Sequence, residues 1–285
     1  MKVFYSPQQS VKKSNRHSPS ASKPKLLVEA WQAVGFPIEI VEPKPCTKSQ
    51  IALAHSTDYV RGVMSQKIPN GFGTQEKEVS KSLLWTSGSL VSASIEAWTH
   101  KTATMSPTSG FHHACYDSGG AFCTFNGLIV AAQMLRLRGA KKVGILDCDQ
   151  HAGNGTENII EKLDLNYIEH WSLGYSDIWS AKVDEWLKEF PTFLKERFSD
   201  VEVLIYQAGA DPHIEDPLGG RMTTEQMRLR DQIVFEFAKE NGIGICWNLA
   251  GGYQDPIGKV LELHTNTLKE CLKVFNTLNK FAKSA

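Results

Sequence analysis

The chain has 285 residues, of which 41% are hydrophobic and 22% are charged, so it is long enough to bury a large core. Its 31 basic residues balance 31 acidic ones, which excludes the global charge excess that recruits nucleic acid or an anionic membrane. The six cysteines form no CxxC pair, and no signal peptide or membrane-spanning apolar stretch is apparent. We therefore expect one soluble, cytoplasmic domain over residues 1–285, with reduced thiols.

Helical and strand patterns alternate along the chain. Residues 2–5 predict a short strand, and the Ser-, Lys- and Pro-rich stretch 6–25 predicts a loop that is too poor in apolar residues to pack. Helical spacing predicts a helix over 26–34, ended by Gly35, and a second strand follows over 36–41. Further helices are predicted over residues 79–98, 122–138, 181–198, 223–241 and 257–281. Buried strands are predicted over 142–147, 201–206 and 243–249.

This alternation predicts an α/β fold of three layers, α/β/α, with a mostly parallel central sheet covered by helices on both faces. Three of the strands end in polar, glycine-rich turns at residues 147–155, 208–211 and 250–253. Ligands bind beyond the carboxyl ends of parallel strands, so these turns should share one rim. Residues 110–114, which follow a short stretch at 104–107, would reach the same rim.

The turn after the strand at 142–147 contains two acids and an imidazole. A strand alternates its faces, so Asp147, Asp149 and His151 should point the same way within a few ångströms of one another. Like charges tolerate such proximity only beside a cation or proton donors, which favours a divalent metal. The alternative is a helix cap, because acids often precede a helix and Asn154 can open one.

A catalytic zinc ion takes three protein ligands and keeps one position for water, a count that Asp149, His151 and Asp211 match. The same donors would also accept Fe(II) or Co(II). Asp211 also fits a second interpretation, as a turn residue ahead of Pro212.

Two further motifs suggest acid–base and oxyanion chemistry. His112 and His113, on a glycine-flanked loop, could both reach one pocket and transfer a proton. The alternative is that they are surface or core residues without a catalytic role, as paired histidines often are. Gly251 allows close backbone approach, and the Tyr253 phenol could donate to an oxyanion, although a glycine turn with a packed aromatic explains this segment equally well. Phe122 and Trp247 could line an apolar channel, with core packing favoured for Trp247.

Taken together, these residues resemble the zinc-dependent histone deacetylase and acetylpolyamine amidohydrolase family, which has the arginase/deacetylase fold. The resemblance covers most of the chain in family order. Its motifs lie at residues 55–60, 70–73, 110–114, 120–126, 147–156, 209–211 and 251–253.

The resemblance implies a zinc-dependent amidohydrolase that removes an acetyl or related acyl group from an amine such as acetyl-lysine or an acetylpolyamine. It implies one Zn²⁺ per chain, a water activated to attack the acyl carbonyl, and K⁺ near Asp147, Asp149 and His151. By the same resemblance, Asp149, His151 and Asp211 bind the metal. His113 is the general base and acid, His112 is an electrostatic helper, and Asp147 and Asn154 orient these two histidines. Tyr253 stabilises the oxyanion, and the substrate contacts are Phe122, Gly120 and Gly251.

The chain also departs from the family pattern. Ala152 stands where a second histidine is common, Ala121 replaces a glycine, and residues 21–24 replace a Glu-Pro-Arg element. The glycine-rich loop at 167–179 is much shortened. These departures leave the metal ligands intact but alter the rim, so the resemblance does not fix the substrate.

Two alternative functions remain open. An arginase-like hydrolase with two manganese ions needs more bridging carboxylates than these turns supply. A binding protein that grips acylated amines without hydrolysing them would have no obvious use for the histidine pair beside Tyr253.

Overall fold

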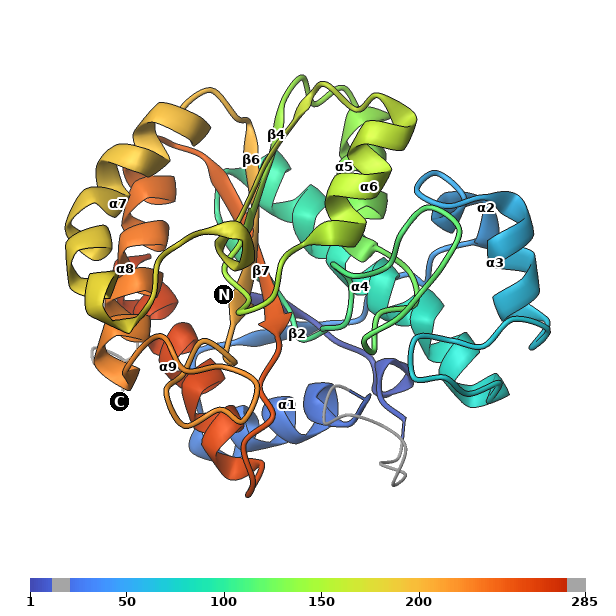
Figure 1. Ribbon diagram of the computed structural model, residues 1–285, viewed down its shortest axis with the longest axis horizontal. Helices are drawn as coiled ribbons and strands as arrows, with labels where there is room; N and C mark the ends of the chain where they lie inside the picture. The colour runs from blue at the N-terminus through green and yellow to red at the C-terminus, as the bar shows by residue number, and fades with distance from the viewer. Residues whose placement is uncertain (12–20, 276–285) are drawn as a thin grey trace.

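The protein is an α/β structure built on one seven-stranded sheet. The computed structural model describes residues 1–11 and 21–275 (Figure 1). The strand order is β2-β1-β3-β7-β6-β4-β5, and every pair is parallel. The strands are β1 (Lys2–Phe4), β2 (Glu39–Val41), β3 (Ala103–Ser106), β4 (Val143–Asp147), β5 (Ile168–Ser172), β6 (Val203–Gly209) and β7 (Gly244–Ala250).

Helices cover both faces of the sheet, which confirms the predicted three-layer architecture (Figure 1). One face carries α1 (Lys23–Val34), α7 (Val183–Phe198), α8 (Thr224–Glu240) and α9 (Gly258–Val274). The other carries α2 (Lys48–Ile51), α3 (Thr57–Met64), α4 (Lys77–His100), α5 (Gly127–Arg136) and α6 (Asn154–Leu163). None of the described helices is both long enough and apolar enough to cross a bilayer.

The central strands are apolar throughout because successive side chains enter opposite cores. Ile145 and Ile205 pack into the core beneath α4 and α5, whereas Leu146 and Leu204 pack into the core beneath α7 and α8. Trp247 is fully buried, with its ring centroid 6.1 Å from that of Trp31 and 6.2 Å from that of Phe235. Trp247 is therefore a core residue, as the sequence favoured.

The predicted loop over residues 6–25 is partly wrong. Residues 12–20 lie outside the described residues, but Gln9 and Val11 are buried, and α1 begins at Lys23 with Pro24 in its first turn. Proline fits there because the first helical N–H groups have no partner within the helix. Lys23 is buried as well, and its amine donates a hydrogen bond to the backbone carbonyl of Gly251.

The helix predicted over 122–138 begins too early. Ala121 and Phe122 have φ angles of 46° and 67°, which a right-handed helix excludes. Helix α5 begins only after Asn126, whose side chain accepts a hydrogen bond from Ile129 N at 3.2 Å.

One further helix ends at a different residue from the prediction, and three short elements were not predicted. Helix α9 is described as Gly258–Val274, and residues 276–281 of the prediction lie outside the described residues. Helices α2 and α3 and strand β5 were not predicted, although Thr47 and Gln50 form a capping box at the start of α2. These elements are short, and the apolar periodicity in them is correspondingly weak.

Candidate active site and metal centre

The three turns predicted to share a rim do so. Strands β4 and β6 pair Asp147 with Gln207, and β6 and β7 pair Gly209 with Ala250, so all three strands end at the same edge. The turn after β6 approaches the turn after β4 closely, since a Cβ on Gly209 would lie 2.6 Å from Asp149 Cα. Glycine at 209 therefore lets the two turns meet.

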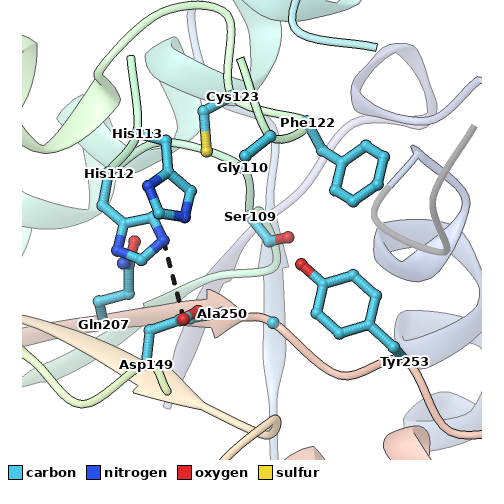
Figure 2. Close-up of a pocket in the computed structure, with 12 residues that line it drawn as sticks. Ser109, Gly110, His112, His113, Phe122, Cys123, Asp149, Gln207, Ala250 and Tyr253 are labelled. Atoms are coloured by element: carbon cyan, nitrogen blue, oxygen red, sulfur yellow. Dashed lines mark ion pairs between the residues drawn. The ribbon is translucent and has the colours of Figure 1, made fainter. Parts of the chain in front are cut away.

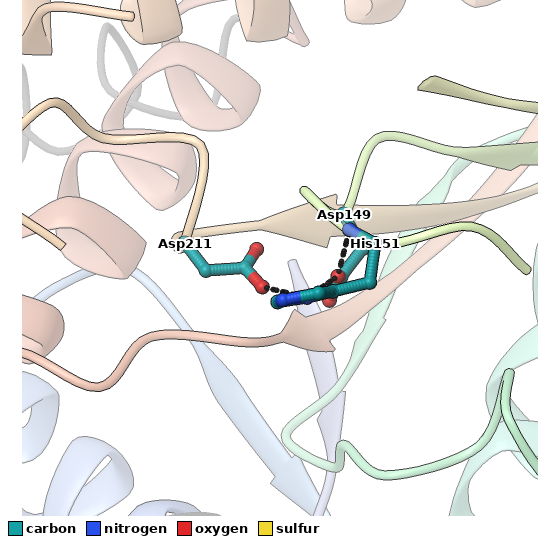
Figure 3. Close-up of side chains that lie close together, drawn as sticks. All are labelled: Asp149, His151 and Asp211. Atoms are coloured by element: carbon teal, nitrogen blue, oxygen red, sulfur yellow. Dashed lines mark hydrogen bonds and ion pairs between the residues drawn. The ribbon is translucent and has the colours of Figure 1, made fainter. Parts of the chain in front are cut away.

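Asp149, His151 and Asp211 converge at this edge (Figure 3). One ligand atom from each lies within 4.8 Å of the others. His151 Nδ1 is 3.1 Å from Asp149 Oδ1 and 3.0 Å from Asp211 Oδ2. Both carboxylates are buried, whereas the His151 side chain is 35% exposed, so the cluster opens to solvent on the histidine side.

The electrostatics of this cluster fit a divalent cation. Burial and the negative charge of Asp149 raise the pKa of Asp211 to about 7. Burial has the same tendency at Asp149, but the charge of His112 and the hydrogen bond from His151 hold the pKa of Asp149 well below its usual range. Two buried carboxylates and an imidazole balance a doubly charged ion, and their oxygen and nitrogen donors are those that zinc accepts.

The histidine pair lies beside the metal ligands, with ring centroids 4.0 Å apart. His112 Nδ1 is 2.7 Å from Asp147 Oδ2, and His113 Nδ1 is 2.6 Å from Asn154 Oδ1. Asp147 is itself fixed, because its Oδ1 accepts hydrogen bonds from Asp149 N at 3.1 Å and Gln207 Nε2 at 2.9 Å.

The two imidazoles differ in charge. Burial opposes protonation of His112, but the charges of Asp147 and Asp149 raise the pKa of His112 to about 9. Burial and the charge of His112 lower the pKa of His113. At neutral pH the structure therefore holds a protonated imidazole beside a neutral one.

Tyr253 faces this group across a pocket (Figure 2). Its hydroxyl and the Asp149 carboxylate both point into the pocket. Burial and the charges of Asp149 and Asp211 raise the pKa of Tyr253 far above its usual range, so the phenol remains a hydrogen-bond donor. The pocket is lined by Ser109, Gly110, His112, His113, Ala121, Phe122, Cys123, Asp149, Gln207, Ala250, Gly251 and Tyr253.

The turn that carries Tyr253 is held from several sides. Gly251 has a φ angle of 48°, and a Cβ there would lie 2.1 Å from Asp211 Cγ, so only glycine fits against this carboxylate. The fully buried Lys23 amine donates to the Gly251 carbonyl. Burial lowers the pKa of Lys23 to about 8 in spite of the nearby charge of Asp211.

Two further residues position this turn, and the sequence reasoning missed both. The Asp216 carboxylate accepts a hydrogen bond from Tyr253 N at 2.7 Å, and His213 Nδ1 accepts one from Gln254 Nε2 at 3.1 Å. Lys23 was considered only as one of residues 21–24, which replace the Glu-Pro-Arg element of the family. The signal available for His213 and Asp216 was their place in the turn that follows Asp211.

Not every candidate lies in the pocket. Gly120 forms an isolated bridge with Cys123 and lies beside a neighbouring depression with Asn70 and Gly71. Phe122 and Gly251 do line the pocket, and the Phe122 and Tyr253 ring centroids are 6.0 Å apart. Within the described residues, no side chain of the shortened segment after β5 reaches the lining.

Comparison with known proteins shows which family the chain is similar to. The sequence profile of the family described as the histone deacetylase domain matches residues 17–173. Histone deacetylase 2 of Arabidopsis thaliana is 28% identical over 256 residues, covering 78% of this chain and 65% of that protein. Acetylpolyamine amidohydrolase of Mycoplana ramosa is 32% identical over 140 residues, covering 46% of this chain and 38% of that protein. The chain thus spans less than two thirds of the length of these two relatives.

Solved structures share the fold. The crystal structure of the HDA15 HD domain superposes with a TM-score of 0.78, covering 95% of this chain and 91% of that chain. The two sequences are 18% identical, so this likeness concerns the fold alone.

Proposed function

Because this chain belongs to the histone deacetylase domain family, we propose that it hydrolyses the amide bond of an N-acylated amine, releasing a carboxylate and a free amine. The observation that carries the proposal is the convergence of Asp149, His151 and Asp211 beside the histidine pair and the Tyr253 hydroxyl. The family consists of metal-dependent deacetylases, and this triad is consistent with its zinc site.

Zinc is the proposed ion, held by Asp149 Oδ, His151 Nδ1 and Asp211 Oδ. When bound, zinc polarises the acyl carbonyl and lowers the pKa of a water molecule toward neutrality. A potassium ion near Asp147, Asp149 and His151 is part of the same proposal. All three protein donors lie at one edge of the sheet, and the exposed side of His151 leaves room for the substrate to approach.

His113 is the proposed general base and acid. The Asn154 Oδ1 atom is an acceptor, so Nδ1 of His113 carries the hydrogen and Nε2 keeps a free lone pair. Nε2 can therefore take a proton from water and pass it to the leaving amine. His112 donates Nδ1–H to Asp147, and the charges of Asp147 and Asp149 raise its pKa in the metal-free protein, so its proposed role is electrostatic.

Tyr253 is the proposed donor to the oxyanion, because its phenol stays protonated and points into the pocket. Phe122 forms an apolar wall beside it, against which the aliphatic part of an acylated amine can pack. Gly251 is a proposed substrate contact because it lines the same pocket. Acetyl-lysine and acetylpolyamines both fit this description.

The experiment is a turnover assay on a panel of acylated lysine peptides and acetylated polyamines, with and without added Zn²⁺. Tyr253→Phe and His113→Gln should each lower kcat by about 10²-fold or more and leave the zinc content at one ion per chain. Tyr175→Phe is the matched control, because Tyr175 is exposed and lies outside the pocket.

Three outcomes would contradict the proposal. Unchanged turnover in both site variants would remove the assigned roles. Tight binding of acetyl-lysine by the zinc-loaded protein without any product would instead favour a binding protein. Two manganese ions per chain would point to an arginase-like hydrolase, although among the described residues only one cluster of three metal-ligating side chains is found.

A further inference from the structure

A buried arginine outside the pocket joins the loops that carry the metal ligands. Arg221 lies in the loop after β6, and its side chain is nearly inaccessible, at 3% exposure for the residue. Its Nη1 donates to Leu173 O at 3.0 Å and Ile178 O at 3.2 Å, both in the segment after β5. Its Nη2 is 3.5 Å from Gln150 O, in the loop after β4. One planar group thus contacts backbone carbonyls of two other loops.

The loops that Arg221 joins are in backbone contact with the ligand residues. A Cβ on Gly174 would lie 2.1 Å from both His151 C and Ala152 N, so the segment after β5 packs directly on His151. A Cβ on Gly219 would lie 1.6 Å from Asp211 O, so the loop after β6 folds back on Asp211. A shift in either loop would therefore move a ligand.

Arg221 is also linked to Asp211 through the backbone. Its N–H donates to Pro212 O at 2.9 Å, next to Asp211 in the chain. Gln150 lies between Asp149 and His151, and its N–H donates to Asp211 Oδ1 at 3.1 Å. Arg221 thus contacts Pro212, the neighbour of one ligand, through its backbone, and Gln150, which lies between the other two ligands, through its side chain.

Trp179 covers the guanidinium from the solvent side. The Arg221 Cζ lies 4.4 Å from the centroid of the Trp179 ring, which is itself 55% exposed. An exposed indole held over a buried cation is stabilised by cation–π attraction. Ser180 Oγ donates to Gly220 O at 3.0 Å and fixes the two segments beside this stack.

We propose that Arg221 is a positioning residue that sets the spacing between Asp211 and the Asp149–His151 pair, and so determines how tightly this chain binds its metal ion. The inference rests on the proposed metal site. Lysine cannot replace Arg221, because an ammonium group is a point charge and cannot reach carbonyls on two sides at once as the planar fork does.

The test measures the dissociation constant of Zn²⁺ by competition with a chromogenic chelator, at a temperature at which circular dichroism shows each variant to be folded. Arg221→Lys should raise this constant about 10- to 100-fold, the usual effect of removing a group that orients metal ligands. Arg61→Lys is the matched control, since Arg61 is exposed and its ion pair within the described residues is with Asp58 in its own helix, and it should leave the constant unchanged.

A second pair of variants avoids changing the arginine. Trp179→Phe keeps an aromatic face over the guanidinium and should bind Zn²⁺ within about threefold of the wild type, whereas Trp179→Ala uncovers Arg221 and should weaken binding by about tenfold. A merely structural role would lower the urea midpoint of the metal-free protein while leaving the Zn²⁺ constant of the folded protein unchanged.

The failures can be told apart. If the wild type binds Zn²⁺ and Arg221→Lys binds it within twofold as tightly, the role of Arg221 is overturned and the proposed function stands. If the wild type binds no Zn²⁺, the metal site is overturned together with this inference. If Arg221→Lys and Trp179→Ala both weaken binding while Arg61→Lys does not, the inference is supported.

Discussion

The amine of Lys23, at the start of α1, donates to the carbonyl of Gly251, two residues before Tyr253. This contact connects the N-terminal part of the chain to the turn that carries the proposed oxyanion donor. Lys23 is fully buried, and its pKa falls to about 8 because burial disfavours the charged amine.

Lys23→Met should therefore separate stability from activity. The substitution removes an unfavourable buried charge but leaves the Gly251 carbonyl without its donor, and each effect is worth about 1–3 kcal/mol. We expect the free energy of unfolding to change by less than about 1 kcal/mol because the two effects oppose each other. We expect kcat to fall at least about tenfold, because the Tyr253 turn loses its support. Urea unfolding and steady-state kinetics measure the two quantities, and equal kcat values would contradict this interpretation.

Replacing the proposed metal ligand Asp211 should abolish the increase in the free energy of unfolding that zinc produces. In the metal-free protein Asp211 has a pKa raised to about 7, so its folded form binds more protons than the unfolded form between about pH 4 and 7, and stability falls as the pH rises through that range. Asp211→Asn should remove this loss. Wild-type protein at 100 times the dissociation constant of Zn²⁺ should gain about 2.7 kcal/mol, and Asp211→Asn should gain almost nothing.

Thermal unfolding with and without Zn²⁺ provides the measurement for this prediction. Asp200→Asn is the control, because Asp200 is an exposed partner of Lys142 far from the ligand cluster, and it should keep the full zinc response. A zinc-dependent rise in the Tm of Asp211→Asn equal to that of the wild type would contradict the assigned ligand.

Ala121 holds a backbone conformation that suits glycine, with a φ angle of 46° directly before Phe122, which lines the pocket. Alanine in this region costs about 1–2 kcal/mol, whereas glycine loses about 0.5–1 kcal/mol more chain entropy on folding. Ala121→Gly should thus raise the free energy of unfolding by up to about 1 kcal/mol. Ala33→Gly, in the exposed part of α1, should lower it by about 1 kcal/mol. Urea unfolding of both variants checks the opposite signs, and a loss of stability in Ala121→Gly would show that the turn is not strained.

His55 predicts a loss of stability in mild acid. Burial lowers the pKa of His55 to about 4, and its Nε2 accepts a hydrogen bond from Asn126 N at 2.8 Å, which protonation would break. The unfolded form, with a pKa near 6.5, binds more protons than the folded form between pH 6.5 and 4, so stability falls as the pH drops through this window. The contribution of His55 is a loss of about 2 kcal/mol between pH 7 and 5.

His55→Gln should be less stable than the wild type at pH 7, and this difference should shrink by about 2 kcal/mol at pH 5, because glutamine does not titrate. Urea unfolding of the two proteins at both pH values isolates the histidine from every other group that titrates. A difference that is the same at pH 7 and pH 5 would show that His55 is protonated in the folded protein as readily as in the unfolded one.

The sequence predicted the centre of the molecule well because its signals are strong there. Apolar runs as continuous as those at 142–147 and 243–249 occur in strands covered on both sides, and the all-parallel sheet confirms that prediction. Asp149, His151 and Asp211 could be placed together because parallel strands end at one edge. The helix predicted to start at 122 failed because periodicity cannot reveal the left-handed backbone at Ala121 and Phe122.

Supports that come from distant segments could not be predicted. Lys23 reads as a surface residue in a polar stretch, and only the fold brings its amine to Gly251. The same holds for Arg221, whose partners Leu173 and Gln150 belong to other loops. A sequence pattern reports the neighbours of a residue along the chain, whereas these contacts join segments that meet only in three dimensions.

The strand order has a consequence for how the protein matures. Strand β6 inserts between β4 and β7, and a contiguous fragment must span residues 149–211 to contain all three ligands. Such long-range pairings form late and slowly. A nascent chain leaving the ribosome cannot complete the ligand cluster until β6 has docked, and it cannot close the pocket until the segment carrying Tyr253 has also emerged. Uptake of the proposed zinc ion would therefore follow the docking of β6 and would not require β7, which completes the sheet only afterwards.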